Sequence, residues 1–280
     1  MERGWVQVKE AYRREDALRA QQVLWQHLEE RGVLKDDPST WQPMVRMNEG
    51  YSTEEFARCD TERFTQAIED LVGADRMRNR HVNTWGWWPV NFALGADRPW
   101  DVPANGWHWD GSHFRHYVDS PEQGVLILCM FSEIGRHAGG TVVVEGSHNV
   151  VAKYLATQPD GVVHRDGINA VNEAHPFFRR LTGMDPIDTK TRMETFMDQE
   201  FVDDDGFHLR VAEVTASPGD VVICHPFLYH ASAQNLSGIP RFMCNRTAAL
   251  KERMRIRGEY ADDELSVVER TIRRALAPSA

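Results

Sequence analysis

The chain has 280 residues, of which 41% are hydrophobic, and its formal net charge at pH 7 is −10. A nucleic-acid-binding surface is expected to be basic, so this acidic balance argues against a nucleic-acid partner. No apolar run approaches the length of a membrane span, and the N-terminus lacks the apolar core of a signal peptide. The cysteines have no CxxC spacing, which is typical of reduced thiols, so we expect a cytoplasmic protein.

The first 80 residues are predicted to be largely helical. Residues 5–8 have the pattern of a short strand, and residues 14–31 carry apolar side chains at helical spacing. A second helix is predicted over residues 61–72, with Thr61 as its N-cap and Gly73 as its end.

From about residue 81 the sequence changes to short segments rich in β-branched and aromatic residues, separated by Gly, Pro, Asn and Asp. The predicted strands are 82–94, 107–110, 124–134, 141–145, 211–216, 220–225, 228–234 and 241–249. Many short strands indicate a sandwich or barrel. We therefore expect one domain over residues 1–280, mainly β with flanking helices: a β core over 81–249, a helical insert over 149–210, and closing helices over 250–280.

Residues 106–113 read GWHWDGSH and combine an imidazole and a carboxylate between large aromatic residues. Side chains alternate faces along a strand, so His108 and Asp110 would share one face and could bind one cation. Trp107 and Trp109 would then point to the other side. A His-x-Asp pair alone is a weak signal, because an exposed polar face has the same pattern.

A second histidine-bearing stretch, PGDVVICHPFLYHASAQNLSGIPRF, contains His225, His230 and Arg241. Two histidines and one carboxylate on one metal form the facial triad typical of non-haem Fe(II) oxygenases, which leaves room for a chelating 2-oxo acid and O₂. Arg241 could pair bidentately with the far carboxylate of that acid. The turn-like NLSGIP would return Arg241 beside Ser232, which shares a strand face with His230.

Taken in order, HWD, GGTVVVEGSH, GDVVICHPFLYHAS and the arginine eleven residues after the second histidine resemble the phytanoyl-CoA dioxygenase family of Fe(II)/2-oxoglutarate oxygenases. The resemblance covers roughly residues 80–249; Glu145 departs from it, because the family often has proline before the Gly-Ser-His turn. It implies a double-stranded β-helix, the cupin-like jelly roll, with Fe(II) and 2-oxoglutarate as cofactors and O₂ as co-substrate. It also makes His108, Asp110 and His230 the iron ligands, and Arg241 with Ser232 the 2-oxoglutarate anchor.

Further residues are candidates for contacts around this site. Phe131 lies where the family often has an aromatic residue beside the co-substrate, so we expect it in the pocket wall. Trp109, His113, Arg115 and His116 are candidates for substrate contacts, and a solvated loop is the alternative for the last three.

Other residues near the motifs have structural interpretations. His225 is expected to be a hydrogen-bonding residue near the site, because proline follows it and it is out of step with His230. Arg246 falls on the opposite strand face from Arg241 and is expected to make an ordinary surface contact. Trp85, Trp87 and Trp88 are expected in the core.

The expected reaction is oxidation of an unactivated C–H bond of a small molecule, such as a secondary metabolite or an acyl or amino-acid derivative, with release of succinate and CO₂. Asp110 favours hydroxylation over halogenation, because halogenating relatives have a small residue there that frees a coordination site for halide. Desaturation, ring formation and epimerisation stay open.

Three other classes of protein also stay open. A non-oxidative cupin-like metalloenzyme, such as an isomerase or epimerase, would not need Arg241. A non-catalytic jelly-roll binding protein would form no succinate. A hydroxylase acting on protein or nucleic acid is the third; the acidic charge and the insert argue against it, because we expect the insert to cover the mouth, enclose a small molecule and set specificity.

Overall fold

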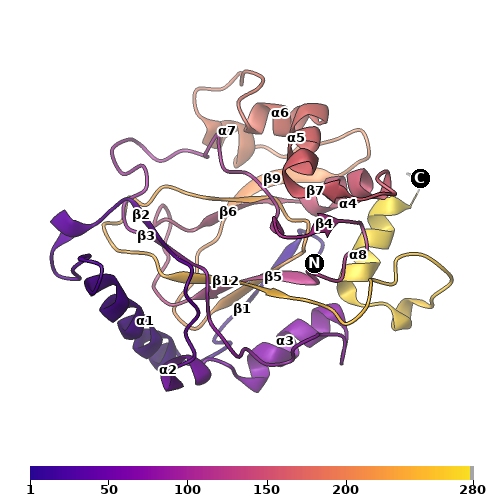
Figure 1. Ribbon diagram of the computed structural model, residues 1–280. Helices are drawn as coiled ribbons and strands as arrows, with labels where there is room; N and C mark the ends of the chain where they lie inside the picture. Colours follow the sequence, from indigo (N-terminus) through magenta and orange to yellow (C-terminus); the bar gives the residue numbers. More distant parts are fainter. Residues whose placement is uncertain (278–280) are drawn as a thin grey trace.

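The computed structural model describes residues 1–277, and two four-stranded antiparallel sheets lie at its centre (Figure 1). The first sheet has the strand order β1 (Trp5–Val8), β10 (Val221–Cys224), β5 (Val125–Met130), β12 (Met243–Ala248). The second has the order β11 (His230–Ser232), β6 (Thr141–Glu145), β9 (His208–Glu213), β8 (Phe201–Val202). Strands β5 and β6 lie in different sheets, and strands β9 to β12 alternate between the two sheets. This topology is the double-stranded β-helix, or jelly roll.

Strand β5 shows how the sequence builds this sandwich. All six residues of VLILCM are buried. Leu126, Leu128 and Met130 pack between the sheets with Val143 of β6, whereas Ile127 and Cys129 pack outward with the helices. Because successive side chains point to opposite faces, a strand covered on both sides is apolar throughout.

Helices cover the outer face of each sheet (Figure 1). Helices α1 (Arg14–Glu29), α2 (Glu54–Ala57) and α3 (Glu62–Val72) lie on the side of β5 and β12. The insert forms α4 (Ser147–Ala156), α5 (His164–Ala174), α6 (Pro176–Leu181) and α7 (Arg192–Phe196) on the side of β6 and β9. Helix α8 (Val267–Leu276) packs against both α3 and α4.

Several predicted elements are confirmed. The strand at 5–8 and the helices at 14–31 and 61–72 are present, and the Thr61 hydroxyl accepts the hydrogen bond of the Phe64 N–H at 3.1 Å as an N-cap does. The insert is helical over most of 149–182, as expected.

Other predictions are wrong. Strand β2 (Met44–Met47), which pairs with β3 (Trp88–Asn91), has no period-2 signal long enough to be recognised. Residues 250–261 are not helical, because backbone N–H groups there bond to other segments, Leu250 to Pro121 O and Met254 to Asp119 O. Two-residue strands β4 (Arg115–His116) and β7 (Val162–Val163) pair with each other. Residues 278–280 of the predicted closing helices lie outside the described residues.

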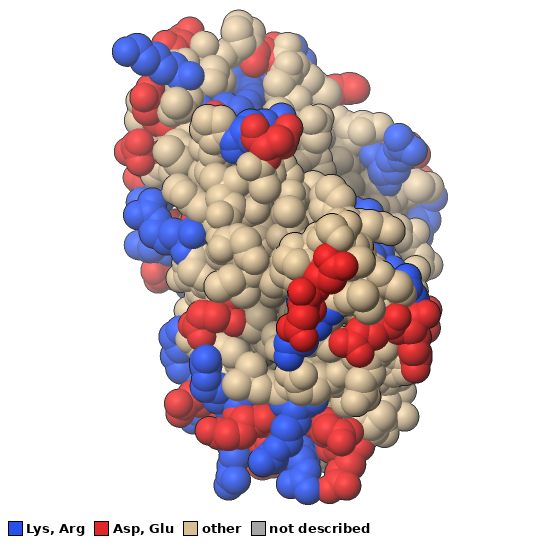
Figure 2. All heavy atoms as spheres, turned by 90° about the vertical axis from the view of Figure 1, so that its left-hand side faces the viewer, with Lys and Arg blue, Asp and Glu red and all other residues tan. Residues whose placement is uncertain are grey.

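The surface agrees with the charge analysis. On the face shown in Figure 2, acidic and basic side chains are interspersed and form no continuous basic area. No helix within residues 1–277 is both long and apolar enough to cross a membrane.

Two buried histidines connect the insert to the first sheet. His148 of α4 and His225, which follows β10, are 2% and 1% exposed, and their ring centroids are 4.8 Å apart. As predicted, His225 makes a structural hydrogen bond: its Nδ1 accepts the N–H of Phe227 at 3.2 Å. Burial lowers the pKa of His148 to about 3, and burial and His148 hold the pKa of His225 well below its usual value.

This pair is expected to make folding acid-sensitive. A histidine whose pKa is lowered by folding binds fewer protons in the folded state, so stability is complete above the unfolded pKa of about 6.5 and falls as the pH drops below it. Each pH unit below that value should cost about 1.4 kcal/mol per histidine until the folded pKa is reached. Urea unfolding of the metal-free protein at pH 7.5 and 5.5 measures this loss, which should be smaller in His148→Gln.

The matched control is His113→Gln, because His113 is exposed and has no ion pair within residues 1–277. This variant should lose as much stability as the wild type between the two pH values. An equal loss in the His148 variant would show that other groups cause the acid sensitivity.

Candidate metal centre and active site

One pair of backbone hydrogen bonds brings the two histidine motifs together. The His108 N–H donates to His230 O at 3.1 Å, and the His230 N–H donates to His108 O at 2.8 Å. Residues 107–110 form this single bridge rather than the predicted strand. The bridge still places the two imidazoles side by side, with ring centroids 4.4 Å apart.

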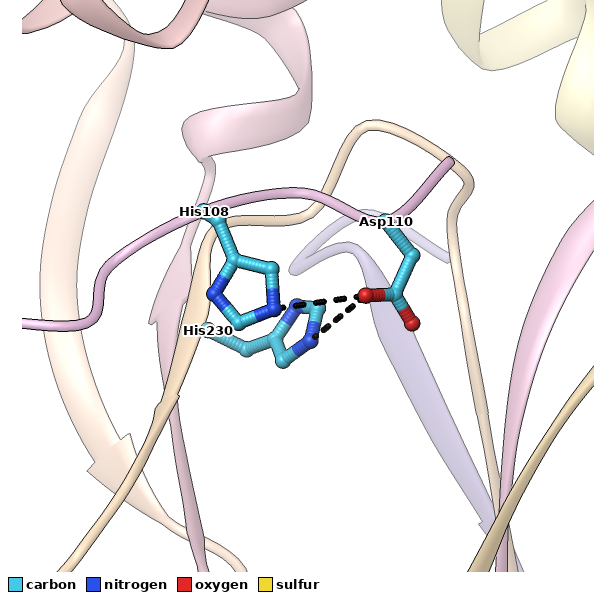
Figure 3. Close-up of side chains that lie close together, drawn as sticks. All are labelled: His108, Asp110 and His230. Atoms are coloured by element: carbon cyan, nitrogen blue, oxygen red, sulfur yellow. Dashed lines mark ion pairs between the residues drawn. The ribbon is translucent and has the colours of Figure 1, made fainter. Parts of the chain in front are cut away.

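Asp110 completes the cluster, as the i, i+2 spacing predicted (Figure 3). Its Oδ1 lies 3.3 Å from Nε2 of His108 and 3.7 Å from Nε2 of His230. The three potential ligand atoms lie within 4.8 Å of one another. Two imidazole nitrogens and one carboxylate on one side of a centre are the donor set of the facial triad.

Backbone carbonyls fix which nitrogen each histidine presents to the centre. Nδ1 of His108 lies 2.7 Å from Gly106 O, and Nδ1 of His230 lies 3.1 Å from Leu228 O. Each Nδ1–H therefore donates to a carbonyl, which leaves the lone pair of each Nε2 directed toward Asp110. The buried Nε2 of His230 has no hydrogen-bond partner within the described chain. Two lone pairs and a carboxylate oxygen that face one another repel, and a cation between them removes the repulsion.

The protonation states suit a cation. Burial alone would raise the pKa of Asp110, but His230 and His108 lower it to about 2. Burial and His108 lower the pKa of His230 to about 4. Burial opposes protonation of His108, yet its hydrogen bond to Asp110, the charge of Asp110 and the Gly106 carbonyl together outweigh burial and raise its pKa. At neutral pH a metal ion thus meets an ionised Asp110 and a neutral His230.

A cavity of about 550 Å³ opens at the cluster. Its inner wall is formed by side chains that point between the two sheets: Leu126, Thr141, Ser232, Met243 and Asn245. His113 also lines the cavity, in agreement with its prediction as a substrate-contact candidate, and so do Arg46, Trp87, Pro89 and Arg246.

Arg241 lies beside this inner wall, with its guanidinium buried and incompletely paired. The residue is 1% exposed, and its Nε–H donates to Gly139 O at 2.8 Å. Neither Nη atom has a partner among residues 1–277. Burial lowers the pKa of Arg241 to about 10, so the group stays charged at neutral pH. A buried charge without a counter-ion is costly, so the two Nη groups favour an anion.

The route by which Arg241 reaches the wall differs from the prediction. Its backbone bridges to Asn91 rather than lying beside Ser232. Arg241 precedes Met243 by two residues, so the two side chains share the inward face. Gly139, which accepts its hydrogen bond, precedes Thr141 by two residues, and Thr141 is the register partner of Ser232. Arg241 itself does not contribute to the cavity lining as described.

The prediction that Phe131 lines the pocket is wrong. Phe131 is fully buried on the outer side of the first sheet, with its ring centroid 5.5 Å from Tyr12 and 5.0 Å from Trp88. The reason is strand parity: the even residues Leu126, Leu128 and Met130 point inward, and the odd ones point outward.

Three other predicted substrate contacts are corrected as well. Trp109 is fully buried and donates its indole N–H to Nδ1 of His116 at 3.2 Å. His116 is 2% exposed and donates from Nε2 to Gly111 O at 2.8 Å, and burial lowers its pKa to about 4. Arg115 donates to the carbonyls of Asp160 and Gly161 at 2.7 and 2.9 Å. All three hold the loop and the insert, and none lines the cavity.

The insert also has another role than the expected one, because none of the cavity-lining residues belongs to 149–210. It braces the two ligand-bearing segments instead. Arg192 of α7 donates to Val102 O at 2.7 Å, and His164 of α5 bonds to Trp109 O. Asn172 of α5 accepts the hydroxyl of Tyr229, next to His230, at 3.2 Å.

Sequence reasoning missed part of the cavity wall. Arg46 comes from the unrecognised strand β2, and Trp87, expected in the core, is 44% exposed. Arg246, expected at the surface, is half-buried at the cavity. Asn245 could have been found, because it lies two residues beyond Met243 on the inward face, and its buried Oδ1 lacks a partner in the described residues. Gln123 gave no sequence signal.

The fold and the site together define a jelly-roll protein with a metal centre of two histidines and one carboxylate. A family model described as Phytanoyl-CoA dioxygenase (PhyH) matches residues 8–243. The chain belongs to this family. A comparison with curated proteins finds no match.

Similar solved structures have low sequence identity to this chain. EvdMO1 is 14% identical over 90% of this chain and 48% of its own, with a TM-score of 0.51, which shows a shared fold. The apoform of EctD from S. alaskensis is 14% identical over 87% of this chain and 72% of its own, with a TM-score of 0.44. HygX from Streptomyces hygroscopicus, with nickel, 2-oxoglutarate and hygromycin B bound, is 13% identical over 94% of this chain and 90% of its own, with a TM-score of 0.46.

The cofactors follow from the family and the cluster. The donor set suits Fe(II), and the unpartnered Nη groups of Arg241 suit a carboxylate, so the residues fit both groups. The protein is an enzyme that depends on Fe(II) and 2-oxoglutarate.

Proposed function

We propose that this enzyme hydroxylates an unactivated C–H bond of a small molecule and releases succinate and CO₂. His108, Asp110 and His230 hold the iron, and Arg241 with Ser232 holds 2-oxoglutarate. The observation that carries the proposal is the pair of free Nη groups on buried Arg241, beside the same wall as the His-Asp-His cluster. A non-oxidative isomerase or a simple binding protein of this fold has no use for such an uncompensated charge.

Each residue has a physical task in this scheme. The bound iron supplies the redox chemistry that couples decarboxylation of 2-oxoglutarate to oxidation of the substrate. Gly106 O and Leu228 O hold both histidines in the tautomer that presents Nε2. Arg241 binds the far carboxylate of 2-oxoglutarate and thereby orients it. The apolar wall of Leu126 and Met243 keeps water from the reacting groups.

Asp110 also bears on the type of reaction. If Asp110 holds the iron, its carboxylate would take a position that a halide could otherwise occupy, which favours hydroxylation over halogenation. The cavity of about 550 Å³ is the size of a small-molecule site. The direct test is incubation with Fe(II), 2-oxoglutarate, O₂ and a metabolite library. A product heavier than its substrate by one oxygen atom supports hydroxylation, whereas a product that has lost two hydrogens or changed only its configuration contradicts it.

Replacing Asp110 by alanine is expected to lower succinate formation by at least about 100-fold, because even second-sphere changes around metal ligands cost 10–100-fold. The iron loses its only anionic protein ligand in the proposed site. Iron content and succinate release are measured on the purified variant. Asp97→Ala is the control, because Asp97 is exposed and makes no ion pair within residues 1–277. Unchanged succinate release from Asp110→Ala would refute the ligand assignment.

A further inference from the structure

The outer part of the cavity combines three features that the proposed chemistry does not use. Arg46 of β2 pairs in register with Pro89 of β3, and both line the cavity. Trp87 lies just before β3, and its carbonyl accepts the N–H of Asn245 of β12 at 3.1 Å. Arg246 follows Asn245. Arg46 and Trp87, here called the mouth residues, therefore lie on adjoining segments around one opening, next to Arg246.

The mouth carries positive charge that no protein group neutralises. Arg46 is exposed and has no ion pair or side-chain hydrogen bond to any described residue. Arg246 donates to Thr84 O at 2.7 Å and stacks 5.0 Å from the ring centroid of Trp85, again without an acidic partner in residues 1–277. Asp110 is the one acidic residue in the cavity wall as described, and it faces the two histidines. The guanidinium of Arg46 is thus available to an anion, whereas that of Arg246 is directed to the outward face of β12, toward Thr84 and Trp85.

Trp87 adds a flat apolar surface in a strained position. Its φ of +64° is in the left-handed region, which a bulky side chain rarely adopts. Its indole is nevertheless 44% exposed, so burial of the ring does not explain the conformation. Strain of this kind accumulates where a side chain is held ready for a ligand. An exposed indole beside an unpaired arginine suits a ring or other flat face next to a negative charge.

We propose that the mouth residues select substrates that carry a carboxylate or phosphate beside a ring or other flat apolar face. The proposal rests on the proposed function, because it uses the same cavity. Arg46 pairs with the anionic group at the opening, and Trp87 packs on the ring. The other end of the substrate then points inward to the His-Asp-His cluster. Arg241 is left to 2-oxoglutarate.

Binding of small probes to the protein loaded with Mn(II) and 2-oxoglutarate tests this directly. Mn(II) in the cluster shortens the NMR relaxation times of protons and phosphorus in any probe that enters the cavity. The probes are indole-3-acetate, its uncharged match indole-3-acetamide, and phenyl phosphate. We expect relaxation enhancement for both anions, and affinity at least about tenfold weaker for the amide, in line with loss of a charge-paired contact.

Variants assign the effect to the mouth residues. Arg46→Gln should weaken both anions, and Trp87→Ala should weaken all three ring probes. Arg246→Gln should leave both anions unchanged, because the guanidinium of Arg246 is directed away from the opening. Arg136→Gln is the matched control, because Arg136 is also exposed and unpaired in the described chain but does not line the cavity. Because the side chain of Arg46 is exposed, the Arg46→Gln variant retains the core packing.

Three results would overturn the proposal. They are no relaxation enhancement for either anion in the loaded wild type, equal affinity for indole-3-acetate and indole-3-acetamide, and a weakening of anion binding by Arg136→Gln equal to that by Arg46→Gln. Weaker binding of 2-oxoglutarate itself in Arg46→Gln would assign that arginine to the co-substrate and also overturn it. Failure of Mn(II) to bind, seen as unchanged water relaxation, would instead contradict the proposed metal site and so identify a failure of the proposed function.

Discussion

Replacement of His230 by alanine is expected to remove iron from the protein, whereas replacement of His225 by alanine is expected to leave iron bound. His230 directs a free Nε2 at Asp110, from a distance of 3.7 Å between Nε2 and Oδ1. His225 is buried against His148, away from the cluster. Loss of one of three protein ligands should lower metal affinity by more than the 10–100-fold typical of an outer-sphere change.

Elemental analysis of both purified variants measures the iron content, and succinate release measures turnover. The His225 variant serves as the matched control, because it also removes a buried imidazole. Its expected phenotype is lower stability with iron retained. Iron retained in the His230 variant and lost from the His225 variant would reverse the assignment.

Arg241→Met is expected to abolish 2-oxoglutarate binding. The same substitution is expected to raise the free energy of unfolding of the cofactor-free protein. The buried guanidinium has two Nη groups without partners among the described residues, and replacing such a charge by an apolar side chain of similar length can stabilise a protein by about 1–4 kcal/mol. In the presence of the co-substrate the same change removes a charged pair worth about 2–5 kcal/mol, which is well over tenfold in affinity. Arg241→Lys keeps the charge but loses the fork, so it should also bind 2-oxoglutarate more weakly.

Anaerobic titration of the Fe(II) protein with 2-oxoglutarate, followed by its visible charge-transfer absorption, gives the affinity. Urea unfolding without cofactors gives the stability. A purely structural arginine would lower stability when replaced and leave the titration midpoint unchanged. That result would move the anchor elsewhere, with Arg246 the next candidate.

Much of the metal cluster could be predicted from sequence, because it depends on local rules. The i, i+2 spacing placed His108 and Asp110 on one face, and this relation survives although the segment forms only one bridge of a strand. The proximity of His230 followed from motif order in the family. Many short strands predicted a sandwich or barrel, and the resemblance to the family implied the jelly roll, which the topology of the two sheets confirms.

The wall of the cavity was far less predictable, because it depends on which strand face points inward and on distant pairings. Phe131 was assigned to the wrong face of its strand. Because this strand is apolar on both sides, the sequence does not show which set of alternate residues points inward. Arg46 and Trp87 reach the cavity only through the pairing of β2 with β3, for which the sequence has no local signal.

The hydrogen bonds by which the insert holds the two ligand-bearing segments also bear on when the enzyme can bind its metal during synthesis. Asp110 and His230 are separated by 230 − 110 = 120 residues, and the insert that holds both segments lies between them. At a synthesis rate of about 5–20 residues per second, the last ligand is made roughly 6–24 s after the first two. His108 and Asp110 alone form only a weak two-donor site during that interval. By the time His230 leaves the ribosome, α5 and α7 have already been made, so the segments that support the ligand residues are available when the last ligand is added.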